Sequence, residues 1–449
     1  MTSSHALFCT DGIRGTAGTF PLDTQTVRRI GAALVKALPR PDARLLIGRD
    51  TRESGVWIER ELAYGARLAG ATVHSIGVAP TPAVAYLTGS LGYDAGVVIS
   101  ASHNPYQDNG IKVFSGAGVK YTAEFEERIE HLVADGAWQV EAGEAPDVPH
   151  ANHLRKYLDH ARAVLTAPDA LGRARVAVDC ANGAMTAVAP TLFHELGFDL
   201  TTLGAEPDGR NINKDVGSTH PEMLAEVVRT GSYRLGVAFD GDGDRAILID
   251  AGGRIIDGDH VMLMCAKQMK AEGRLRGNAV VATVMSNIGL EIALRNLGID
   301  LIRTKVGDKY VMEEMQKRGL SLGGEQSGHL IFSEHLFTGD GLITALSVLQ
   351  TMAASGRELA DLASDLTTYP QVLLNVRVRE KVELEKIPEV AAAMKTVERR
   401  LGANGRLLVR YSGTEPLLRV MLEGQNAQDI DLWAREIADA VSKAIGQRQ

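Results

Sequence analysis

Apolar and polar positions follow one order three times between about residues 44 and 329. Each copy begins with a short apolar run typical of a buried strand, continues as a helical stretch that stops at a glycine, and resumes as a second apolar run. The opening runs are residues 45–47, 176–178 and 280–282, and the glycines are Gly70, Gly197 and Gly298. A strand, a helix and a strand in this order predict right-handed crossovers in a mainly parallel sheet.

Each copy ends in a further apolar strand that leads into a loop of unusual composition. These strands are predicted at residues 96–99, 235–239 and 320–323. The loops carry a Ser-His pair, a cluster of aspartates, and a Glu followed by a Ser and a His. Because α/β proteins keep their chemistry at the carboxyl ends of strands, we expect the three loops to face one cleft.

The pattern changes after Thr367. Alternating strands are predicted at 372–378, 407–411 and 417–422, the last two as a hairpin, and Asn426 can cap a final amphipathic helix. The predicted fold class is α/β: three similar mixed α/β domains followed by a smaller α+β C-terminal domain, arranged around a central cleft. The predicted domains are 1–150, 151–253, 254–368 and 369–449, with a linker over 135–149.

Composition narrows the possible functions. The 449 residues are 45% hydrophobic and 23% charged, as in an ordinary globular protein, and the net charge of -8 argues against a general nucleic-acid or membrane-surface binder. We expect no signal peptide and no membrane span, because the apolar runs are too short. We expect Cys9, Cys180 and Cys265 to be reduced, buried and structural in a cytoplasmic protein.

Asp240, Asp242 and Asp244 alternate with glycines directly after a predicted strand. Glycine lets the backbone turn tightly, so the carboxylates can converge on one hard cation, Mg²⁺ or Ca²⁺. An EF-hand is excluded because its sixth and twelfth positions, Gly and Glu, are Arg245 and Ala251 here. The alternative is a solvated acidic turn, but three carboxylates so close repel one another strongly without a cation.

Ser102 and His103 also follow a predicted strand, and a Ser-rich connector is the simplest alternative. Phosphoryl transfer would link this hydroxyl to the aspartates, since a phosphoserine oxygen can complete a Mg²⁺ shell. The uncatalysed reaction is so slow that a metal, cations and positioning are all needed. The candidate cations are Arg14, Arg49, Lys112 and Arg245.

Two further loops have the composition of ligand sites. Glu325 and Ser327 are suited to gripping neighbouring hydroxyl or amine groups of a sugar, and His329 follows them. A loop of small residues with two arginines predicts a phosphate site, with an ordinary hairpin turn as the alternative. Its residues are Arg410, Ser412, Gly413, Thr414 and Arg419. The chain has no Gly-Lys dipeptide, so a nucleotide-binding Walker loop is excluded.

Taken together, five motifs resemble those of the α-D-phosphohexomutase family over essentially the whole chain. They are Thr10-Asp-Gly-Ile-Arg14-Gly, Ser100-Ala-Ser102-His-Asn-Pro, Asp240-Gly-Asp-Gly-Asp-Arg245, Gly324-Glu-Gln-Ser-Gly-His329 and Arg410-Tyr-Ser-Gly-Thr-Glu-Pro416. The forms of the first two, with Gln326, are most similar to the bacterial branch that acts on glucosamine phosphates.

The resemblance implies a heart-shaped four-domain fold and a Mg²⁺-dependent interconversion of glucosamine 6-phosphate and glucosamine 1-phosphate, which supplies UDP-N-acetylglucosamine and cell-wall synthesis. It implies that phosphorylated Ser102 forms a bound 1,6-bisphosphate, with glucosamine or glucose 1,6-bisphosphate as activator. The implied ligands of one Mg²⁺ per chain are Ser102, Asp240, Asp242 and Asp244. Glu325 and Ser327 would hold the sugar, and the loop of Arg410, Ser412, Gly413, Thr414 and Arg419 the phosphate that is not reacting.

The resemblance also implies catalytic duties for Arg14, Lys112, His103 and His329, among which the general acid and base are to be sought. It implies a cytoplasmic monomer or homodimer that binds a phosphosugar, without nucleic acid or membrane. The alternatives are a relative acting on glucose or mannose phosphates, a serine-phosphate hydrolase, and a non-catalytic sugar-phosphate sensor.

Overall fold

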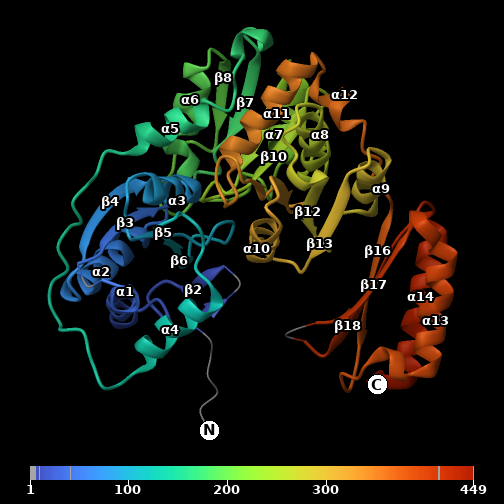
Figure 1. Ribbon diagram of the computed structural model, residues 1–449, viewed down its shortest axis with the longest axis horizontal. Coiled ribbons are helices and arrows are strands. Elements are labelled where there is room, and N and C mark those ends of the chain that lie inside the picture. Colours follow the sequence, from blue (N-terminus) through green and yellow to red (C-terminus); the bar gives the residue numbers. More distant parts are fainter. Residues whose placement is uncertain (1–6, 10, 41, 413–414, 448–449) are drawn as a thin grey trace. The chain divides into compact units, whose positions relative to one another are not determined.

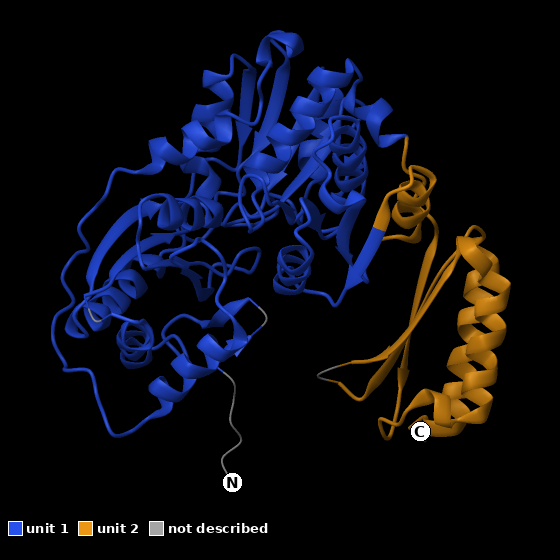
Figure 2. Cartoon of the chain, in the orientation of Figure 1, with its two compact units in different colours: residues 1–285, 301–364 blue, residues 286–300, 365–449 orange. Residues whose placement is uncertain are grey.

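The computed structural model describes residues 7–9, 11–40, 42–412 and 415–447. The chain forms two compact units, drawn in blue and orange in Figure 2. The first unit is Met1–Met285 with Leu301–Ser364, and the second is Ser286–Asp300 with Asp365–Gln449. Three α/β sheets belong to the first unit, apart from the first residue of β13, and an antiparallel sheet belongs to the second.

The first sheet has six strands in the order β1-β2-β6-β5-β3-β4 (Figure 1). β3 pairs in parallel with β4 and β5, whereas β6 runs antiparallel to β5. The strands are β1 Phe8–Cys9, β2 Gly12–Thr16, β3 Arg44–Arg49, β4 Thr72–Val78, β5 Ala95–Ile99 and β6 Asp108–Ser115. The associated helices are α1 Thr24–Ala37, α2 Gly55–Leu68, α3 Thr81–Ser90, α4 Ala123–Ala134 and α5 Leu154–Arg162.

The second sheet repeats this scheme in the order β11-β10-β9-β7-β8. β7 lies parallel to β8 and β9, and β10 returns antiparallel to β9. The strands are β7 Arg175–Asp179, β8 Asp199–Leu203, β9 Leu235–Phe239, β10 Ala246–Asp250 and β11 Ile255–Ile256. The helices are α6 Ala189–Glu195 and α7 Glu222–Thr230, and short 3₁₀ turns lie at Pro168–Leu171 and Ala184–Ala187.

The third sheet has the order β13-β12-β14-β15, with β12 parallel to β14 and β15 antiparallel to β14. Its strands are β12 Ala279–Thr283, β13 Asp300–Thr304, β14 Leu322–Gly324 and β15 Leu330–Phe332. Helices nearby in the sequence are α8 Gly258–Ala271, α9 Ile288–Asn296, α10 Asp308–Arg318, α11 Gly341–Ser355 and α12 Leu359–Ala363, and a 3₁₀ turn lies at Arg276–Asn278. β14 begins two residues later than expected because Gly319 and Leu320 still close the end of α10.

The fourth sheet is antiparallel in the order β16-β18-β17. Its strands are β16 Gln371–Arg377, β17 Arg406–Tyr411 and β18 Leu417–Glu423. α13 Pro388–Leu401 and α14 Ala427–Ile445 pack their apolar sides against the sheet (Figure 1), and 3₁₀ turns lie at Leu384–Lys386 and Gly402–Asn404. Asn426 caps α14 as expected, accepting hydrogen bonds from the N–H groups of Gln428 and Asp429.

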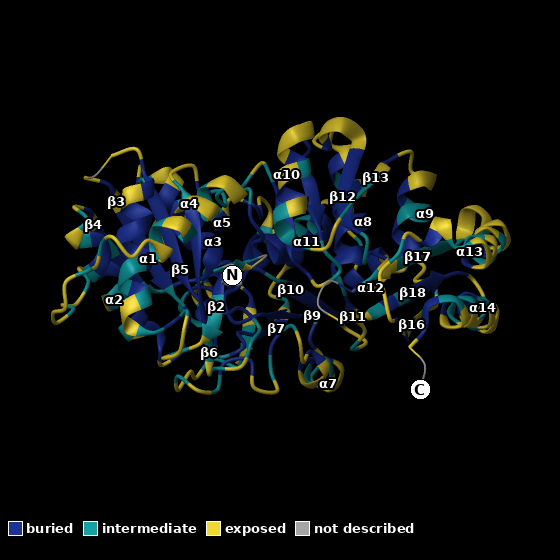
Figure 3. Ribbon diagram, turned by 90° about the horizontal axis from the view of Figure 1, so that it is seen from below, coloured by how far each residue is buried: buried dark blue, intermediate teal, exposed yellow. Residues whose placement is uncertain are grey.

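These sheets confirm the predicted fold class of three similar mixed α/β parts followed by a smaller α+β part. In each copy the first helix is followed by a glycine of positive φ, at Gly70, Gly197 and Gly298, where a side chain would be strained. Buried residues lie mainly along the sheets, and exposed residues lie on outer helices and loops (Figure 3). The boundaries at 150, 253 and 368 stay a prediction.

One expectation about the cysteines is wrong. Cys180 and Cys265 are buried, but Cys9 is exposed, and all three thiols are free. Cys9 lies on the two-residue edge strand β1, where alternate side chains face outward. Among the described residues, no helix is long and apolar enough to span a membrane.

Candidate active site

The three polar loops of the first unit meet. Each connects the last parallel strand of a copy to the antiparallel strand that follows, namely β5 to β6, β9 to β10 and β14 to β15. The Ser102 hydroxyl of the first loop donates a 2.6 Å hydrogen bond to Asp240 of the second. The N–H of Ala246, just after the second loop, donates to the carbonyl of Gly328 in the third at 3.1 Å. The repeated topology thus brings the three loops to one place.

Ser102 lies at this meeting point in an unusual backbone conformation. Its φ is 53°, in the left-handed region that few residues other than glycine adopt. The residue is buried, and its N–H donates to the Ser100 hydroxyl at 2.9 Å. The Nδ1 atom of His103 lies 3.5 Å from the Ser102 Oγ. A strained, buried hydroxyl between an imidazole and a carboxylate is typical of a reactive group.

Asp240, Asp242 and Asp244 are buried, with one carboxylate oxygen of each within 4.8 Å of the others. The Oδ1 atoms of Asp242 and Asp244 are buried and have no hydrogen-bond partner among the described residues. Burial, together with the charges of Asp244 and Asp242, raises the pKa of Asp240 well above its ordinary value. Buried carboxylate oxygens without a hydrogen-bond partner are stabilised by a nearby positive charge. The cluster of three aspartates therefore fits a hard divalent cation.

Lys112 supplies part of that positive charge. Its Nζ atom lies 2.8 Å from Asp242 Oδ2 and 3.2 Å from Asp244 Oδ2. Burial by itself would lower the pKa of Lys112, but Asp11, Asp242 and Asp244 raise it well above its ordinary value. The hydroxyl of Thr81 at the start of α3 donates to the same Asp242 oxygen as Lys112 does, at 2.6 Å.

Ion pairs continue from Lys112 around a closed ring of alternating charge. Its six members are Lys112, Asp11, Lys120, Asp308, His329 and Asp244. The Nζ of Lys120 lies 2.6 Å from Asp11 and also pairs with Asp308. The His329 ring lies 3.6 Å from both Asp308 and Asp244. The ring joins residues near all three sheets of the first unit.

The ring sets the charge state of its members. Burial alone would raise the pKa of Asp11, but Lys112 and Lys120 lower it well below the ordinary range. Burial likewise opposes the charge on His329, yet Asp244 and Asp308 raise the pKa of its imidazole. The pKa of His103, outside the ring, is lowered by burial and by Arg245 and Arg14. The two histidines near the serine therefore differ in their preference for a proton.

The arginines predicted near the site divide into two groups. Arg14 pairs with Asp11 and donates to the Ala101 carbonyl at 3.4 Å, beside the serine loop. Arg245 Nη1 lies 3.4 Å from His103 Nδ1. Arg49 instead forms an ion pair with Glu59 at 2.9 Å. The structure thus brings Arg14 and Arg245 close to Ser102, and gives Arg49 another partner.

The Glu325 loop is held in a tight turn. The Glu325 N–H donates to the His329 carbonyl, and the Gly328 N–H donates to the Glu325 carbonyl. One Glu325 oxygen accepts from the Gly307 N–H at 3.1 Å, and Ser327 is exposed. Gln326 donates from its amide to Asp257 at 3.0 Å. A carboxylate and a hydroxyl two residues apart are therefore presented at the edge of the meeting point.

The predicted phosphate loop belongs to the second unit. Arg410 and Arg419 lie directly opposite each other in the β17–β18 ladder, so their side chains share one face. Ser412 is buried, its N–H donates to the Leu417 carbonyl at 2.8 Å, and its carbonyl accepts from Lys381 at 2.6 Å. Gly413 and Thr414 lie outside the described residues, as does Thr10 of the first motif.

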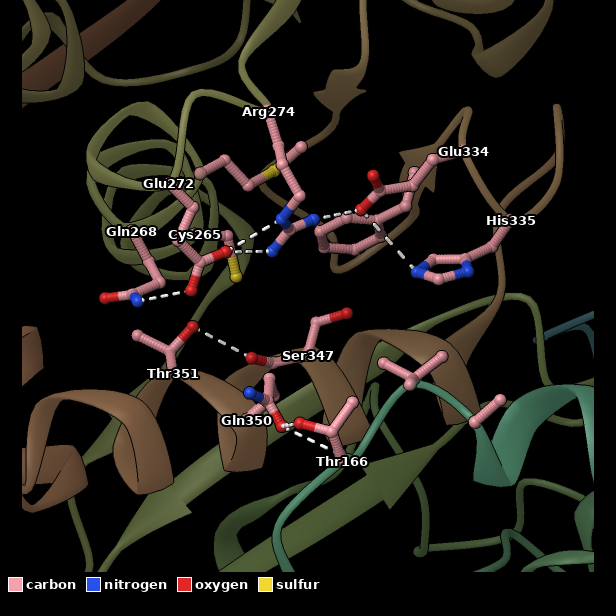
Figure 4. Close-up of a pocket in the computed structure, with 14 residues that line it drawn as sticks. Thr166, Cys265, Gln268, Glu272, Arg274, Glu334, His335, Ser347, Gln350 and Thr351 are labelled. Atoms are coloured by element: carbon pink, nitrogen blue, oxygen red, sulfur yellow. Dashed lines mark hydrogen bonds and ion pairs between the residues drawn. The ribbon is translucent and has the colours of Figure 1, made fainter.

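A separate hollow of about 400 Å³ lies between α8 and α11 (Figure 4). Its polar side chains pair with one another: Arg274 with Glu272 and Glu334, Gln268 with Glu272, and Gln350 with Thr166. Since its arginine is already neutralised by two carboxylates, this hollow is a poor candidate for binding a phosphate.

Sequence reasoning missed several residues of the site. Asp11 stands inside the quoted motif before Arg14, but no role was assigned to it. Lys120 and Asp308 lie in neither a quoted motif nor an expected loop. Arg52, which contacts the serine loop, follows β3 in the polar run Arg49-Asp-Thr-Arg52. Like the three polar loops, this run lies at the end of a strand. That position was the signal in the sequence that could have identified Arg52.

Comparisons with known proteins place this fold in one class. Four segments match the descriptions "Phosphoglucomutase/phosphomannomutase, alpha/beta/alpha domain" I, II and III and "C-terminal domain", at residues 5–139, 155–253, 257–369 and 373–440. The solved structure of a phosphoglucomutase/phosphomannomutase family protein from Burkholderia thailandensis gives a TM-score of 0.80 at 24% identity, over 99% of this chain and 98% of that chain.

The chain belongs to the phosphoglucomutase/phosphomannomutase family. The curated phosphoglucosamine mutase of Solibacter usitatus is 48% identical to it, over 98% of this chain and 99% of that protein. The structure of an N-acetylphosphoglucosamine mutase from Aspergillus fumigatus, in complex with GlcNAc-6P and magnesium, has the same fold, with a TM-score of 0.67 at 18% identity over 98% and 96% of the chains.

Proposed function

We propose that this protein is a phosphoglucosamine mutase, an isomerase that interconverts glucosamine 6-phosphate and glucosamine 1-phosphate. The observation that carries the proposal is the 2.6 Å hydrogen bond from the Ser102 hydroxyl to Asp240, inside a cluster of three buried aspartates. The full-length likeness to the phosphoglucosamine mutase of Solibacter usitatus supports this choice of substrate. The product then feeds UDP-N-acetylglucosamine and cell-wall synthesis.

In the proposed reaction Ser102 works as a phosphoserine. A free hydroxyl oxygen of the sugar phosphate attacks the phosphorus atom of the phosphoserine. The bond from this phosphorus to the Ser102 Oγ breaks, and the proton of the attacking hydroxyl passes to a base. The resulting 1,6-bisphosphate turns over in the site. The Ser102 Oγ then attacks the other phosphoryl group, the bond from that phosphorus to the sugar oxygen breaks, and the sugar oxygen takes the proton back from the base, which restores the phosphoserine and releases the isomer. Lys112, His103 and His329 are the candidates for moving the proton, and Arg14 supplies positive charge beside the serine loop.

The metal in this proposal is one Mg²⁺ per chain. Asp240, Asp242, Asp244 and an oxygen of Ser102 or its phosphate would hold it. Their oxygen chemistry fits such an ion, as do the two buried carboxylate oxygens that lack a hydrogen-bond partner among the described residues. When bound, the ion supplies positive charge for the phosphoryl group in transfer. Lys112 neutralises two of the same carboxylates, so this residue also affects the affinity for the ion.

Two loops, one in each unit, are proposed to bind parts of the substrate. Glu325 and Ser327 bind the sugar hydroxyl and amine groups. Arg410, Ser412, Gly413, Thr414 and Arg419 bind the phosphate that is not reacting. The pairing of Arg410 with Arg419 across β17 and β18 supports this role, because two guanidinium groups on one face suit a dianion. We further propose that a sugar 1,6-bisphosphate is the activator, and that the protein works in the cytoplasm as a monomer or homodimer.

Coupled assays on glucosamine, glucose and mannose 6-phosphates, side by side, test the proposed function. We expect glucosamine 6-phosphate to be the best substrate, with dependence on a trace of sugar bisphosphate and no net release of phosphate. A preference for glucose or mannose phosphates would move the protein to another branch of the family. Stoichiometric phosphate release would instead identify a serine-phosphate hydrolase.

A further inference from the structure

Two side chains from distant parts of the chain grip the backbone of the serine loop. The Ser102 carbonyl accepts hydrogen bonds from Arg52 Nη2 and from Asn213 Nδ2, both at 2.9 Å. The Asn104 carbonyl accepts from the same two nitrogens, at 2.8 Å and 3.3 Å. Two carbonyls of one short loop are thus each held from two directions.

Arg52 is the more deeply placed of the two. Its side chain is 0% exposed, and its guanidinium also donates to the carbonyls of Pro105 and Asp108, so it binds four backbone carbonyls between Ser102 and the first residue of β6. Its Nε donates to Asp50 at 2.8 Å. Asp50 also accepts from the Ser100 hydroxyl, which in turn accepts from the Ser102 N–H. The peptide of Ser102 is therefore tied to the Asp50–Arg52 pair at both its N–H and its carbonyl.

Asn213 reaches the same loop from the stretch between β8 and α7. It is buried and has a φ of 57°, and its N–H donates to the Ala181 carbonyl at 2.9 Å. Gly241 of the aspartate loop packs against this contact. A Cβ at Gly241 would lie 2.6 Å from the Ser102 carbonyl oxygen and 2.8 Å from Asn213 Nδ2. The aspartate loop and the serine loop therefore touch through the atoms that Asn213 binds.

We propose that Arg52 and Asn213 are positioning residues, which hold the Ser102 peptide in its left-handed conformation and so aim the serine oxygen at the aspartates and the sugar phosphate. The proposal rests on the function proposed above. The left-handed conformation is unfavourable for serine, so the neighbours must stabilise it. Four hydrogen bonds from two nitrogens to two carbonyls supply that stabilisation, and the deep burial of Arg52 keeps water from replacing them.

The expected effect falls on the chemical step. An error of about 1 Å in the position of a reacting atom can cost ~10²-fold in rate. Arg52→Lys keeps the positive charge but loses the planar fork that reaches four carbonyls. We expect its kcat to fall by ~10²-fold while KM for glucosamine 6-phosphate changes by less than about twofold, because its contacts are to the loop rather than to the substrate. Asn213→Ala should lower kcat less, and Asn213→Asp more than Asn213→Ala, since a carboxylate would face two carbonyl oxygens.

The test combines steady-state kinetics with the ³¹P NMR signal of the phosphoserine in the full-length, Mg²⁺-loaded protein. Arg29→Lys is the matched control, because Arg29 also donates to four backbone carbonyls, those of residues 132, 133, 135 and 138. Asn211→Ala is the control for the Asn213 loop, since its side-chain amide donates to the Glu206 carbonyl instead. We expect a shifted or broadened phosphoserine signal in Arg52→Lys and Asn213→Ala, and the wild-type signal and kcat in both controls.

Three outcomes would overturn the proposal: a wild-type phosphoserine signal in both positioning variants, a loss confined to KM, or equal losses of kcat in the controls. If Arg52→Lys does not fold, as judged by its circular dichroism, Asn213→Ala and Asn213→Asp decide the question by the same readouts. Absence of mutase activity in the wild-type protein would refute the proposed function instead. This result does not depend on any variant, so it can be distinguished from a failure of the positioning proposal.

Discussion

The loops of the first unit and the β17–β18 hairpin of the second satisfy their charges in different ways. Ser102, Lys112 and the three aspartates are each at most 4% exposed, and protein groups surround them. The side chain of Arg419 is 35% exposed, its nearest carboxylate oxygen, on Glu415, lies 3.7 Å away, and Arg410 is exposed. One region has its charges fixed by the fold, whereas the other presents cations toward solvent.

This difference supports the proposal that the first region carries the chemistry and the hairpin binds phosphate. Charges buried beside partners cannot reorganise freely, so they form a fixed environment for a reacting group. Exposed arginines lose little when an anion arrives, because they were not committed to a buried partner. We therefore expect substitutions in the first region to act on turnover and metal binding, and substitutions in the hairpin to act on affinity for phosphosugars.

The strongest test of the chemical region is Ser102→Ala. Without the Oγ atom no phosphoserine forms, so mutase turnover should fall by ~10⁴-fold or more. A coupled assay measures the loss, and phosphopeptide mass analysis should find phosphate on Ser102 in the wild type. Normal turnover in this variant would show that another group carries the phosphoryl group, and the assignment of the two regions would fail.

Asp242→Asn tests the carboxylate cluster with a smaller change. It removes one charge at nearly constant shape, so affinity for Mg²⁺ should fall and turnover should drop by ~10²-fold or more. Titration calorimetry with Mg²⁺ alone gives a readout that does not depend on turnover. Asp250→Asn is the control, because that buried carboxylate accepts from the N–H groups of Gly252 and Arg254 in its own turn. Unchanged Mg²⁺ binding in Asp242→Asn would reduce the cluster to an acidic turn.

Arg410→Ala tests the binding region. Loss of one charged hydrogen bond is worth ~1.5–3 kcal/mol, so affinity should fall roughly 10- to 150-fold. The 1-phosphate, the 6-phosphate and the bisphosphate should be affected alike, since in the proposed reaction one site serves both ends of the sugar, and Mg²⁺ binding should persist. Arg400→Ala, which breaks the exposed Arg400–Glu436 pair of the same unit, should leave these affinities unchanged. An effect on only one sugar phosphate would contradict a shared site.

The smallest expected effect concerns stability and pH. Tyr157 donates to both oxygens of buried Asp340, and burial raises the pKa of Asp340 to about 7. The folded state thus binds this proton more tightly than the unfolded state, whose pKa is about 3.9. The contribution of Asp340 to stability is therefore greatest below about pH 4 and is lost as the pH rises toward 7.

Asp340→Asn should remove this dependence. Its melting temperature relative to wild type should rise by roughly 2–4 °C between pH 4.5 and 7.5. Thermal melts in matched buffers measure the difference, and Arg410→Ala, with its exposed side chain, should show no comparable trend. Parallel pH profiles for Asp340→Asn and wild type would mean that the buried carboxyl is not titrating in this range.

The sequence alone predicted the parts of the site that are local. Ser102 and the three aspartates each come just after an apolar strand, so their place at a strand end can be predicted from the local pattern. The repeated strand, helix and glycine pattern also predicted the three α/β parts, because that periodicity reflects burial on a sheet. Cys9 was predicted wrongly, since an apolar run does not reveal whether its strand lies at an edge.

Tertiary structure alone decided how the loops are held together. Lys120 meets Asp11 across 109 residues and Asp308 across 188, and Asn213 meets the Ser102 carbonyl across 111. Arg52 stands in a polar run after a strand, but only the fold shows that its side chain is completely buried against four carbonyls. Such contacts depend on how whole sheets pack against one another. They leave no periodic pattern in the nearby sequence from which they could be predicted. Short-range pattern therefore predicted the candidate reactive groups, and long-range packing decided which charges and hydrogen-bond partners surround them.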